Sequence, residues 1–228
     1  MRAMRALQTD FYGDVNIGLF AKACDKLCVL GNNISGKRIG KIQKVLGGKT
    51  FQTSLANSEL IGIFCALNSN GIVLPKIATQ REVEGFREVA DGLDMSVSVI
   101  GSKFTALGNL ILCNDKGAVV SSLIDAKDKK KIEECLGVDS DYGTVAGLDS
   151  VGSCGIATNK GCVLHRDASE EELDRVQETL HVDSDIGTAN FGSPFVGSCG
   201  IANSNGVVTG ETTTGPEITR IMEALSLL

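Results

Sequence analysis

Hydrophobic and polar residues are arranged along this chain in two recurring patterns. Residues 95–100 alternate small polar and apolar side chains with the period of two that a half-buried strand requires. Residues 83–93 place apolar side chains three and four positions apart, after Thr79 and Glu82, which predicts an amphipathic helix that begins with a capping box. Further helices are expected to begin at Asp125, Ser169 and Thr214. The chain is therefore expected to combine short strands with amphipathic helices.

The same motifs occur more than once. Residues 151–157 recur as residues 196–202, and residues 136–145 recur with substitutions as residues 180–189, so two independent motifs share a separation of 44 to 45 residues. Weaker copies are marked by a glycine at the corresponding place, and the five positions are Gly18, Gly62, Gly108, Gly152 and Gly197. This shared period indicates an internal repeat whose units stack, because one unit alone cannot bury its apolar faces.

Each repeat is expected to contain a hairpin and a helix. In four copies a second glycine, preceded by Asn or Asp, follows the first one, and these glycines are Gly71, Gly117, Gly161 and Gly206. Asn and Asp tolerate positive φ and make local hydrogen bonds, so these sites are predicted to close β-hairpins. Gly47, Gly92 and Gly137 are expected to end the first three helices. The predicted order in each unit is strand, hairpin, strand, helix and a final strand.

The two ends of the chain indicate a closed ring. The fifth copy ends at residue 228 without a final strand, whereas an orphan strand at residues 5–13 precedes the first copy. We predict that this N-terminal strand completes the fifth unit, which leaves no exposed sheet edge. We therefore expect a single domain over residues 1–228, an α/β ring with closed five-fold pseudosymmetry built from repeats at about 15–58, 59–106, 107–150, 151–195, and 196–228 plus 1–14.

Composition narrows the class of protein. Apolar residues make up 43% of the 228 positions and charged residues 22%, which is the balance of a folded globular protein. The net charge of −6 and the ten aromatic residues argue against a protein that coats DNA or RNA. No apolar stretch has the length of a signal peptide or a membrane span, so a cytoplasmic protein without a membrane partner is expected.

The possible metal ligands do not form a recognisable set. The eight cysteines are expected to be reduced in the cytoplasm, and their spacing matches no zinc template. The pairs Asp139/Asp141 and Asp183/Asp185 follow predicted helix ends, where turn hydrogen bonds account for them without a cation. No metal and no cofactor are therefore expected.

Charge is distributed unevenly between the repeats. Residues 15–58 carry seven Lys and Arg against one acidic residue, whereas residues 151–195 carry three basic and eight acidic residues. A ring with a basic side and an acidic side is able to orient on a surface that contains both RNA and basic protein. The alternative is that Lys37, Lys41 and Lys44 simply form the solvated face of a helix.

Three segments, at residues 17–22, 105–115 and 151–154, resemble the translation initiation factor 6 family in its archaeal form, and the resemblance covers essentially the whole chain. The resemblance implies the pentein fold, which is a closed α/β propeller with five-fold pseudosymmetry. It also implies a monomeric initiation factor of protein biosynthesis and ribosome biogenesis that is not an enzyme. It also implies binding to the intersubunit face of the large ribosomal subunit, against a ribosomal protein near the sarcin–ricin loop, with rRNA as an optional further contact. Bound there, family members sterically prevent association with the small subunit.

The expected ribosome-binding residues follow the five repeated glycines, at positions where the copies diverge. They are Leu19, Ile63, Asn109, Ser153 and Ser198, together with Cys154. The resemblance associates Asn109 with the subunit-facing surface and matches Ile63 and Cys154 to neighbouring positions. Divergence at equivalent positions is what an asymmetric partner requires, although packing around the ring axis would explain the same residues.

Guanidine-modifying enzymes share the five-unit ring and supply the alternative function, an amidinotransferase or deiminase-like hydrolase. That chemistry needs a nucleophilic cysteine, a histidine and carboxylates, for which Cys199 or Cys154, His165 and Asp167 are the candidates. The duplicated Gly-Ser-Cys-Gly segments argue against it, because a nucleophile normally occurs in one unit only. A protein that binds RNA directly is opposed by the acidic balance and the few aromatic residues.

Overall fold

Each repeat forms a three-stranded sheet in the computed structural model, which describes residues 4–228. The middle strand of each sheet pairs antiparallel with the inner strand and parallel with the outer strand. The inner strands are β2 (Ala21–Ala23), β5 (Ala66–Leu67), β8 (Ile111–Cys113), β11 (Gly155–Ala157) and β14 (Gly200–Asn203). The middle strands are β3 (Leu27–Gly31), β6 (Gly71–Pro75), β9 (Ala118–Val120), β12 (Cys162–His165) and β15 (Gly206–Gly210). The outer strands are β4 (Lys49–Thr53), β7 (Ser96–Ile100), β10 (Ser140–Tyr142), β13 (Ser184–Gly187) and β1 (Ala6–Thr9).

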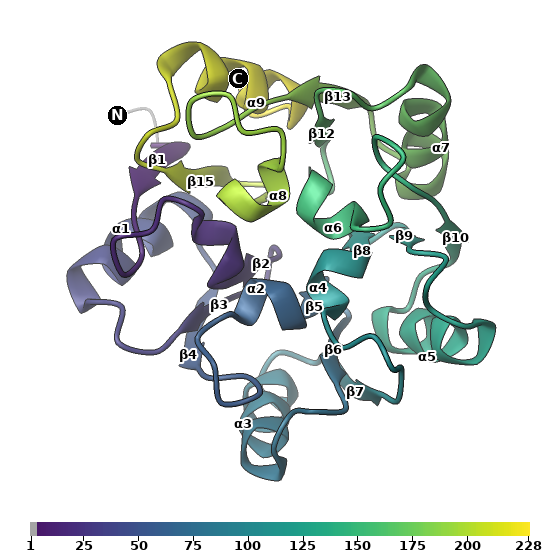
Figure 1. Ribbon diagram of the computed structural model, residues 1–228. Helices are drawn as coiled ribbons and strands as arrows, with labels where there is room; N and C mark the ends of the chain where they lie inside the picture. The colour runs from purple at the N-terminus through teal and green to yellow at the C-terminus, as the bar shows by residue number, and fades with distance from the viewer. Residues whose placement is uncertain (1–3) are drawn as a thin grey trace.

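Figure 1 views the molecule along its pseudo-five-fold axis, with the five sheets arranged as blades around the centre. The long helices lie on the outside of the ring, and in the first four blades each connects the middle strand to the outer strand, whereas the fifth follows its middle strand as the last element of the chain. They are α1 (Gly36–Leu46), α3 (Gln80–Asp91), α5 (Ala126–Leu136), α7 (Glu170–Leu180) and α9 (Gly215–Ala224). This arrangement confirms the predicted α/β propeller and the predicted order of strand, hairpin, strand, helix and strand.

The predicted helix starts are confirmed. Thr79, Ser169 and Thr214 form capping boxes with glutamates three residues later, so that hydroxyl and carboxylate satisfy N–H groups that have no partner within the helix. Asp125 caps α5 by accepting a hydrogen bond of 2.8 Å from the N–H of Asp128. The side chains of these four residues therefore fix the entry of the chain into its helices.

Two of the three predicted helix ends have the expected geometry. Gly47 and Gly137 adopt φ of +65° and +63°, in the left-handed region that favours glycine. The third helix also ends at its predicted glycine, since Gly92 is the C-cap of α3, but Gly92 has φ of −70° and the residue with positive φ is Asp94, at +52°. All three predicted helix ends are therefore confirmed, and only the position of the left-handed residue differs after α3.

The two ends of the chain meet in one blade, as predicted. β1 pairs parallel with β15 in the register Ala6↔Val207 to Thr9↔Gly210, so the N-terminal strand is the outer strand of the fifth sheet. Arg5 also donates a hydrogen bond of 2.9 Å to the carbonyl of Leu227. Because β15 gains its outer neighbour from the other end of the chain, the ring is closed by hydrogen bonds instead of a covalent link.

A short helix that the sequence analysis missed precedes every inner strand. These helices are η1 (Ile17–Leu19), α2 (Ile61–Phe64), α4 (Leu107–Leu110), α6 (Val151–Cys154) and α8 (Val196–Cys199), and they surround the axis in Figure 1. In the duplicated segment at 151–157, Val151–Cys154 is helical and only Gly155–Ala157 is extended. One turn of helix is too short to show a helical period in the sequence.

The repeated glycines of these short helices form a closed cycle of backbone contacts. A Cβ at Gly62 would overlap the carbonyl oxygen of Gly18 and lie 2.6 Å from that of Ala21. The same relation links Gly108 to Gly62, Gly152 to Gly108, Gly197 to Gly152, and Gly18 to Gly197. Glycine is therefore needed here because the blades approach each other at the backbone, not because of a positive φ.

The predicted hairpins are confirmed, but their glycines serve close packing instead of a positive φ. Gly71, Gly117, Gly161 and Gly206 do not have positive φ. A Cβ at Gly71 would overlap the carbonyl oxygen of Cys135, and the other three glycines also lie against backbone carbonyls of a neighbouring segment. The Asn side chains act partly as expected, since Asn68 Oδ1 accepts from the N–H groups of Asn70 and Gly71 at 2.9 and 3.0 Å. Asn68 Nδ2 also reaches the next blade, where it donates to the carbonyl of Asn114 at 3.0 Å.

The hydrophobic core is divided into five clusters, one at each boundary between blades. In one of them, Phe86 of α3 is fully buried together with Val29 of β3 and Leu74 of β6. The other four clusters are equivalent, and the one between the fifth and first blades contains Val208 of β15 and Ile42 of α1. Each blade therefore depends on its neighbours to bury its apolar surface, as the repeat pattern predicts.

Candidate functional site

One end of the ring carries all five short helices and the turns that precede them. We call this surface the short-helix face and define it by residues 11–20, 55–64, 101–110, 145–154 and 189–199. Figure 1 looks onto it. The side chains expected to bind the ribosome follow the ring glycines, one from each short helix, and all are partly exposed: Leu19, Ile63, Asn109, Ser153 and Ser198. The structure thus brings these five residues together at one end of the molecule.

The side chain of Cys154 is not exposed on this face, although the residue belongs to its segment 145–154. Its side chain is fully buried in the cluster between the third and fourth blades, beside Val151 and Leu164. Burial raises the pKa of its thiol, although Ser150 and Ser153 act in the opposite direction. The sequence analysis grouped Cys154 with its exposed neighbours because it did not recognise the helical turn, which directs adjacent side chains to different sides.

Asn109 and Ser153 differ in how far the chain itself satisfies their polar groups. Ser153 Oγ donates to the carbonyl of Ser150 at 2.8 Å, within its own helical turn. The side-chain amide of Asn109 makes no hydrogen bond to any other group within residues 4–228. Asn109 therefore presents both a donor and an acceptor to solvent on the short-helix face.

The turns of the short-helix face expose aromatic side chains that the sequence analysis did not single out. Phe191 is 83% exposed, Tyr12 is 46% exposed and Phe195 is 39% exposed. Tyr12 and Phe191 occupy tight turns with φ of +56° and +64°, closed by the bridges Phe11↔Asp14 and Ala189↔Ser193. The signal available in the sequence was the Asn-Phe-Gly triplet at 190–192, where a large apolar residue occupies a turn position.

Hydrogen bonds hold the Phe191 turn in place. The carboxylate of Glu217, in the first turn of α9, accepts from the N–H of Phe191 at 3.2 Å and from that of Gly192 at 2.8 Å. Asn190 Nδ2 donates to the carbonyl of Val15 at 2.8 Å, which ties this turn to the one that contains Tyr12. Burial opposes ionisation of Glu217, but these hydrogen bonds and those from Thr214 hold its pKa below the usual value. The exposed ring of Phe191 thus extends from a rigid base.

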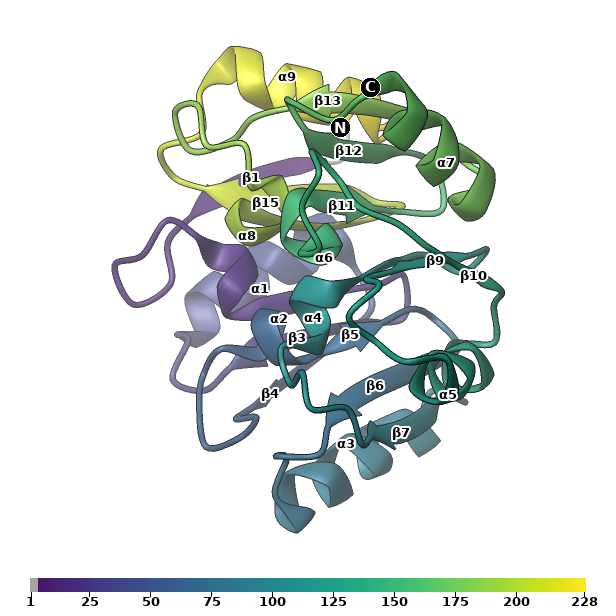
Figure 2. The same cartoon turned by 45° about the vertical axis from the view of Figure 1, so that its right-hand side comes forward.

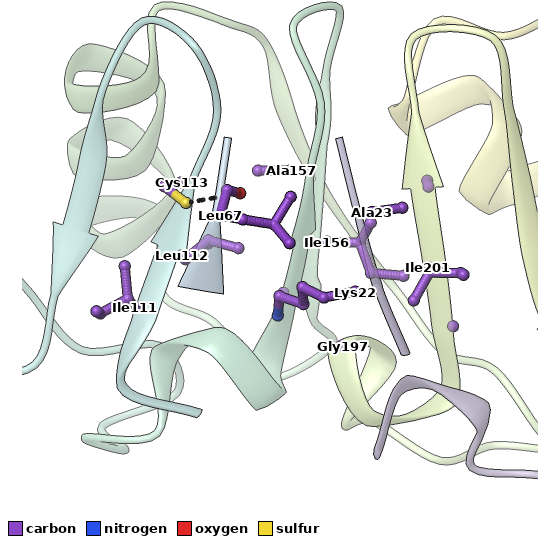
Figure 3. A pocket seen from close by; sticks show the side chains of 13 residues that line it. Lys22, Ala23, Leu67, Ile111, Leu112, Cys113, Ile156, Ala157, Gly197 and Ile201 are labelled. Carbon is purple, nitrogen blue, oxygen red and sulfur yellow. Dashed lines mark hydrogen bonds between the residues drawn. The ribbon is translucent and has the colours of Figure 1, made fainter. Parts of the chain in front are cut away.

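A narrow cavity lies on the ring axis between the inner strands. It has a volume of about 30 Å³ and is walled by all five inner strands (Figure 3). Its lining is mainly apolar and includes Leu67, Leu112, Ile156 and Ile201. The side chain of Lys22 points into it. This space has room for one or two water-sized groups, so it cannot hold a guanidine substrate.

At the hairpin end of the axis, polar side chains close a second space of about 20 Å³. Asn159 Nδ2 bridges two carboxylates, since it donates to Asp115 at 2.6 Å and to Asp25 at 2.9 Å. Ser204 donates to Asp25 from its N–H and its hydroxyl, both at 2.7 Å, and the N–H of Ser69 donates to Asp115 at 2.7 Å. Both carboxylates are therefore engaged within the fold.

The residues considered for guanidine chemistry do not form a catalytic group. Cys199 and Cys154 are fully buried, and burial raises the pKa of the Cys199 thiol, so it stays protonated at neutral pH. His165 is buried and packs edge-on against Phe195. Its Nδ1 atom accepts a hydrogen bond of 3.1 Å from the backbone N–H of Asp167. None of these residues lines the axial cavity. His165 therefore supports an aromatic residue of the short-helix face.

Within residues 4–228, the cysteines are free thiols and no three His, Cys, Asp or Glu side chains are grouped so as to hold a metal ion. Over the same range of the chain, every helix is too short or too polar to cross a membrane.

The uneven charge seen in the sequence becomes a separation across the ring. Helix α1 exposes Lys37, Lys41 and Lys44, whereas α7 exposes Glu170, Glu171 and Asp174. Figure 1 places α1 and α7 on opposite sides of the molecule. The lysines do form the solvated face of an amphipathic helix, because Ile42 and Val45 on the other side of α1 are buried.

Comparison with known proteins gives a consistent picture. A model of the eIF-6 family matches residues 6–224. The chain is 45% identical over 195 residues to translation initiation factor 6 of Thermococcus kodakarensis, covering 84% of this chain and 85% of that protein. It is 41% identical over 157 residues to the protein of the same name from Pyrococcus horikoshii, covering 68% and 69% of the two chains. The relative from Methanocaldococcus jannaschii, which carries the same name, is 40% identical over 151 residues and covers 65% of each chain.

Proposed function

The chain belongs to the eIF-6 family and is a translation factor, and we propose that it binds the intersubunit face of the large ribosomal subunit and sterically prevents association with the small subunit. In this proposal the short-helix face makes the contact. The partner is a ribosomal protein near the sarcin–ricin loop, with rRNA as an optional further contact, and the factor acts as a cytoplasmic monomer. DNA and membranes are not among its partners.

The observation that carries this proposal is the exposed aromatic side chain of Phe191 on a turn fixed by Glu217 and Asn190. Aromatic side chains contribute disproportionately to protein–protein binding, and a rigid base lowers the entropy lost when the partner is bound. Phe195 and Tyr12 extend the apolar area beside it. The short-helix face therefore has the properties of a docking surface.

The amide of Asn109 supports the same surface from the opposite part of the ring. It lies on α4, whereas Phe191 and Tyr12 flank the fifth blade, so polar and aromatic contacts are separated across the face. A partner that satisfies both sets has only one orientation on a ring with pseudo-five-fold symmetry. Leu19, Ile63, Ser153 and Ser198 complete the contact at the equivalent positions.

The size of the molecule is consistent with a steric mechanism. A chain of 228 residues folds to a radius of gyration of about 17 Å. A rigid body of that size on the intersubunit face occupies space that the small subunit needs for joining. No moving part and no chemical step are required, so we propose that the protein is not an enzyme.

Sedimentation of purified large and small subunits in a sucrose gradient tests the proposal. With added protein we expect a smaller peak of joined ribosomes and comigration of the protein with the large subunit at a ratio of one to one. If the peak of joined ribosomes is unchanged and the protein stays at the top of the gradient, the proposal is wrong. Incubation with arginine and assay for citrulline checks the alternative enzymatic function, for which we expect no product.

A further inference from the structure

Helix α1 carries a row of positive charges that have no partner in the fold. The exposed side chains of Lys37, Lys41 and Lys44 are spaced four and three residues apart, so they lie on one face of the helix. The opposite face contains Ile42 and Val45, which are buried between the first and fifth blades. Within residues 4–228 none of the three ammonium groups forms an ion pair or a hydrogen bond. We call these three side chains the α1 lysine row.

The other four long helices show that the fold does not require these charges. Each of them has an exposed glutamate at the place equivalent to Lys44, nine residues after the N-cap, and these are Glu88, Glu134, Glu178 and Glu223. Each also has an acidic third residue, where α1 has Arg38. Helix α1 contains no acidic residue at all. Because the five helices occupy equivalent places in the ring, packing does not explain a reversal of charge in one of them.

The start of the row is unfavourable for the helix itself. Lys37 lies in the first turn, where the partial positive charge of the helix N-terminus disfavours a cation, and the N-cap Ser35 makes no side-chain hydrogen bond to the helix. Lys37 and Lys41 are also four residues apart, a spacing at which like charges repel. Only Lys44, near the C-terminal end, is favoured by the helix dipole. Charges that break a local rule without a gain inside the fold indicate a functional role.

The acidic residues around the first blade do not neutralise the row. Asp10 forms the ion pair with Arg38, and Glu59 accepts a backbone N–H in the loop before α1. Asp25, the one acidic residue of the first repeat, accepts its hydrogen bonds at the hairpin end of the ring axis. The outer side of the first blade therefore keeps a positive charge that a partner is able to use.

The row begins at the rim of the short-helix face. Tyr12, in a turn of that face, donates a hydrogen bond to the carbonyl of Asn32 in the loop that leads into α1. From there the helix runs to the hairpin end of the ring, where the carbonyl of Leu46 accepts the side-chain amide of Asn205 at 2.9 Å. Figures 1 and 2 show α1 toward the left of the ring and the acidic helix α7 at its right. A large partner on the short-helix face therefore has the row at one edge of the contact.

We propose that the α1 lysine row binds the phosphate backbone of RNA at the edge of the contact with the large subunit, an inference that rests on the proposed ribosome binding. From Lys37 to Lys44 the row extends about 10 Å along the helix. That length corresponds to about three successive phosphates of one strand of a duplex. RNA repels the acidic face of α7, so the separation of charge across the ring favours one orientation of the factor.

The surface of α1 favours RNA over an acidic protein as the partner. None of the exposed large hydrophobic side chains of the molecule belongs to α1. Protein interfaces depend on buried apolar and aromatic anchors, whereas contacts to a phosphate backbone need only positive charge. Lysine suits such a contact because its ammonium group acts as a point charge without a fixed geometry.

The salt dependence of binding to purified large subunits tests the row. The row variant combines Lys37→Gln, Lys41→Gln and Lys44→Gln. The control variant removes three exposed basic residues of the second to fourth blades that form no ion pair within residues 4–228, by Arg87→Gln, Lys130→Gln and Lys160→Gln. We expect the slope of log affinity against log salt concentration to become shallower by about 2 to 3 in the row variant, because fewer counterions are released, and to stay unchanged in the control. Both variants should keep the Tm of the unaltered protein, since all six side chains are exposed.

Hydroxyl-radical footprinting of the rRNA, with large subunits saturated by each protein, identifies the partner. The unaltered protein and the control variant should protect a short rRNA segment that the row variant leaves exposed. A slope that is the same in the row variant and the control overturns this inference but leaves the proposed subunit binding intact. A shallower slope with an unchanged footprint assigns the row to an acidic protein and also overturns it. If the unaltered protein does not bind large subunits, the proposed function is wrong and this inference is wrong with it.

Discussion

Arg38, in the first turn of α1, forms an ion pair with Asp10 at the junction where the two ends of the chain meet. The same place in three other blades is occupied by a glutamate of the long helix that binds the preceding turn. Glu82 accepts from Ser54, Glu172 from Thr144 and Glu217 from Thr188, at 2.7 to 2.9 Å. The closing junction therefore keeps the contact between helix and turn, but an ion pair between Arg38 and Asp10 replaces the hydrogen bond between a glutamate and a hydroxyl group.

We expect removal of one of these glutamates to destabilise the ring. Glu172 accepts hydrogen bonds from the N–H groups of Ala146, Gly147 and Ser169 at 2.8 to 3.0 Å, in addition to the one from Thr144. Glu172→Ala leaves these donors without an acceptor and should lower the free energy of unfolding by about 2 kcal/mol. Urea unfolding measures the change, and Glu171→Ala, an exposed neighbour on α7, should shift it by less than about 0.5 kcal/mol. Equal effects of the two substitutions would contradict this role of Glu172.

Stability should decrease in acid because of the same glutamates. Burial raises the pKa of Glu82, Glu172 and Glu217, but hydrogen bonds to their carboxylates outweigh it and leave each pKa below 4.5. The unfolded chain therefore binds protons at a higher pH than the folded ring. The stabilisation is complete above about pH 4.5 and is lost as the pH falls through the folded values. Denaturant midpoints measured across this range should fall, and the fall should be smaller in a protein with all three residues changed to Gln.

A methyl group at a ring glycine should be far more disruptive than one on a helix surface. A Cβ at Gly108 would overlap the carbonyl oxygen of Gly62 and lie 2.6 Å from that of Cys65, whereas a Cβ at Gly40 meets nothing within 4 Å. Gly108→Ala should cost about 3 kcal/mol or prevent folding, because backbone must shift. Gly40→Ala should be neutral or stabilise by about 0.5 to 1 kcal/mol. Thermal unfolding of both variants provides the measurement, and a stable Gly108→Ala protein would show that the blades are not in backbone contact.

Phe191 should contribute to subunit binding and not to stability. Phe191→Ala removes an exposed ring and should weaken binding to the large subunit about 10-fold or more, with Tm unchanged. Val99→Ala provides the matched control, because Val99 is 39% exposed on the outer strand β7, outside the short-helix face. Cosedimentation with large subunits measures both variants. Equal binding by Phe191→Ala and the unaltered protein would remove Phe191 from the contact.

Asn109 should behave in the same way on the other side of the face. Asn109→Glu places a charge where the amide makes no intramolecular hydrogen bond within residues 4–228, so the fold should tolerate it. We expect weaker cosedimentation with the large subunit at unchanged Tm. If Tm falls in step with binding, Asn109 has a packing role in the ring and is not a contact residue.

The sequence by itself determined the repeat, the closed ring and the position of the long helices. The period of about 45 residues, the capping boxes at Thr79, Ser169 and Thr214, and the orphan strand at the N-terminus are local or counting signals, and they need no knowledge of which segments touch. The five residues after the ring glycines were located for the same reason, since a repeat places equivalent positions at the same end of a ring.

The tertiary structure decided which side chains are exposed and which groups lack partners. Cys154 and Ser153 are adjacent in the sequence, but one turn of helix buries the first and leaves the second partly exposed. The rigid base of Phe191 and the contact of Arg38 with Asp10 both depend on segments that are far apart in the chain. Such properties arise from the packing of blades against one another, which no local pattern records.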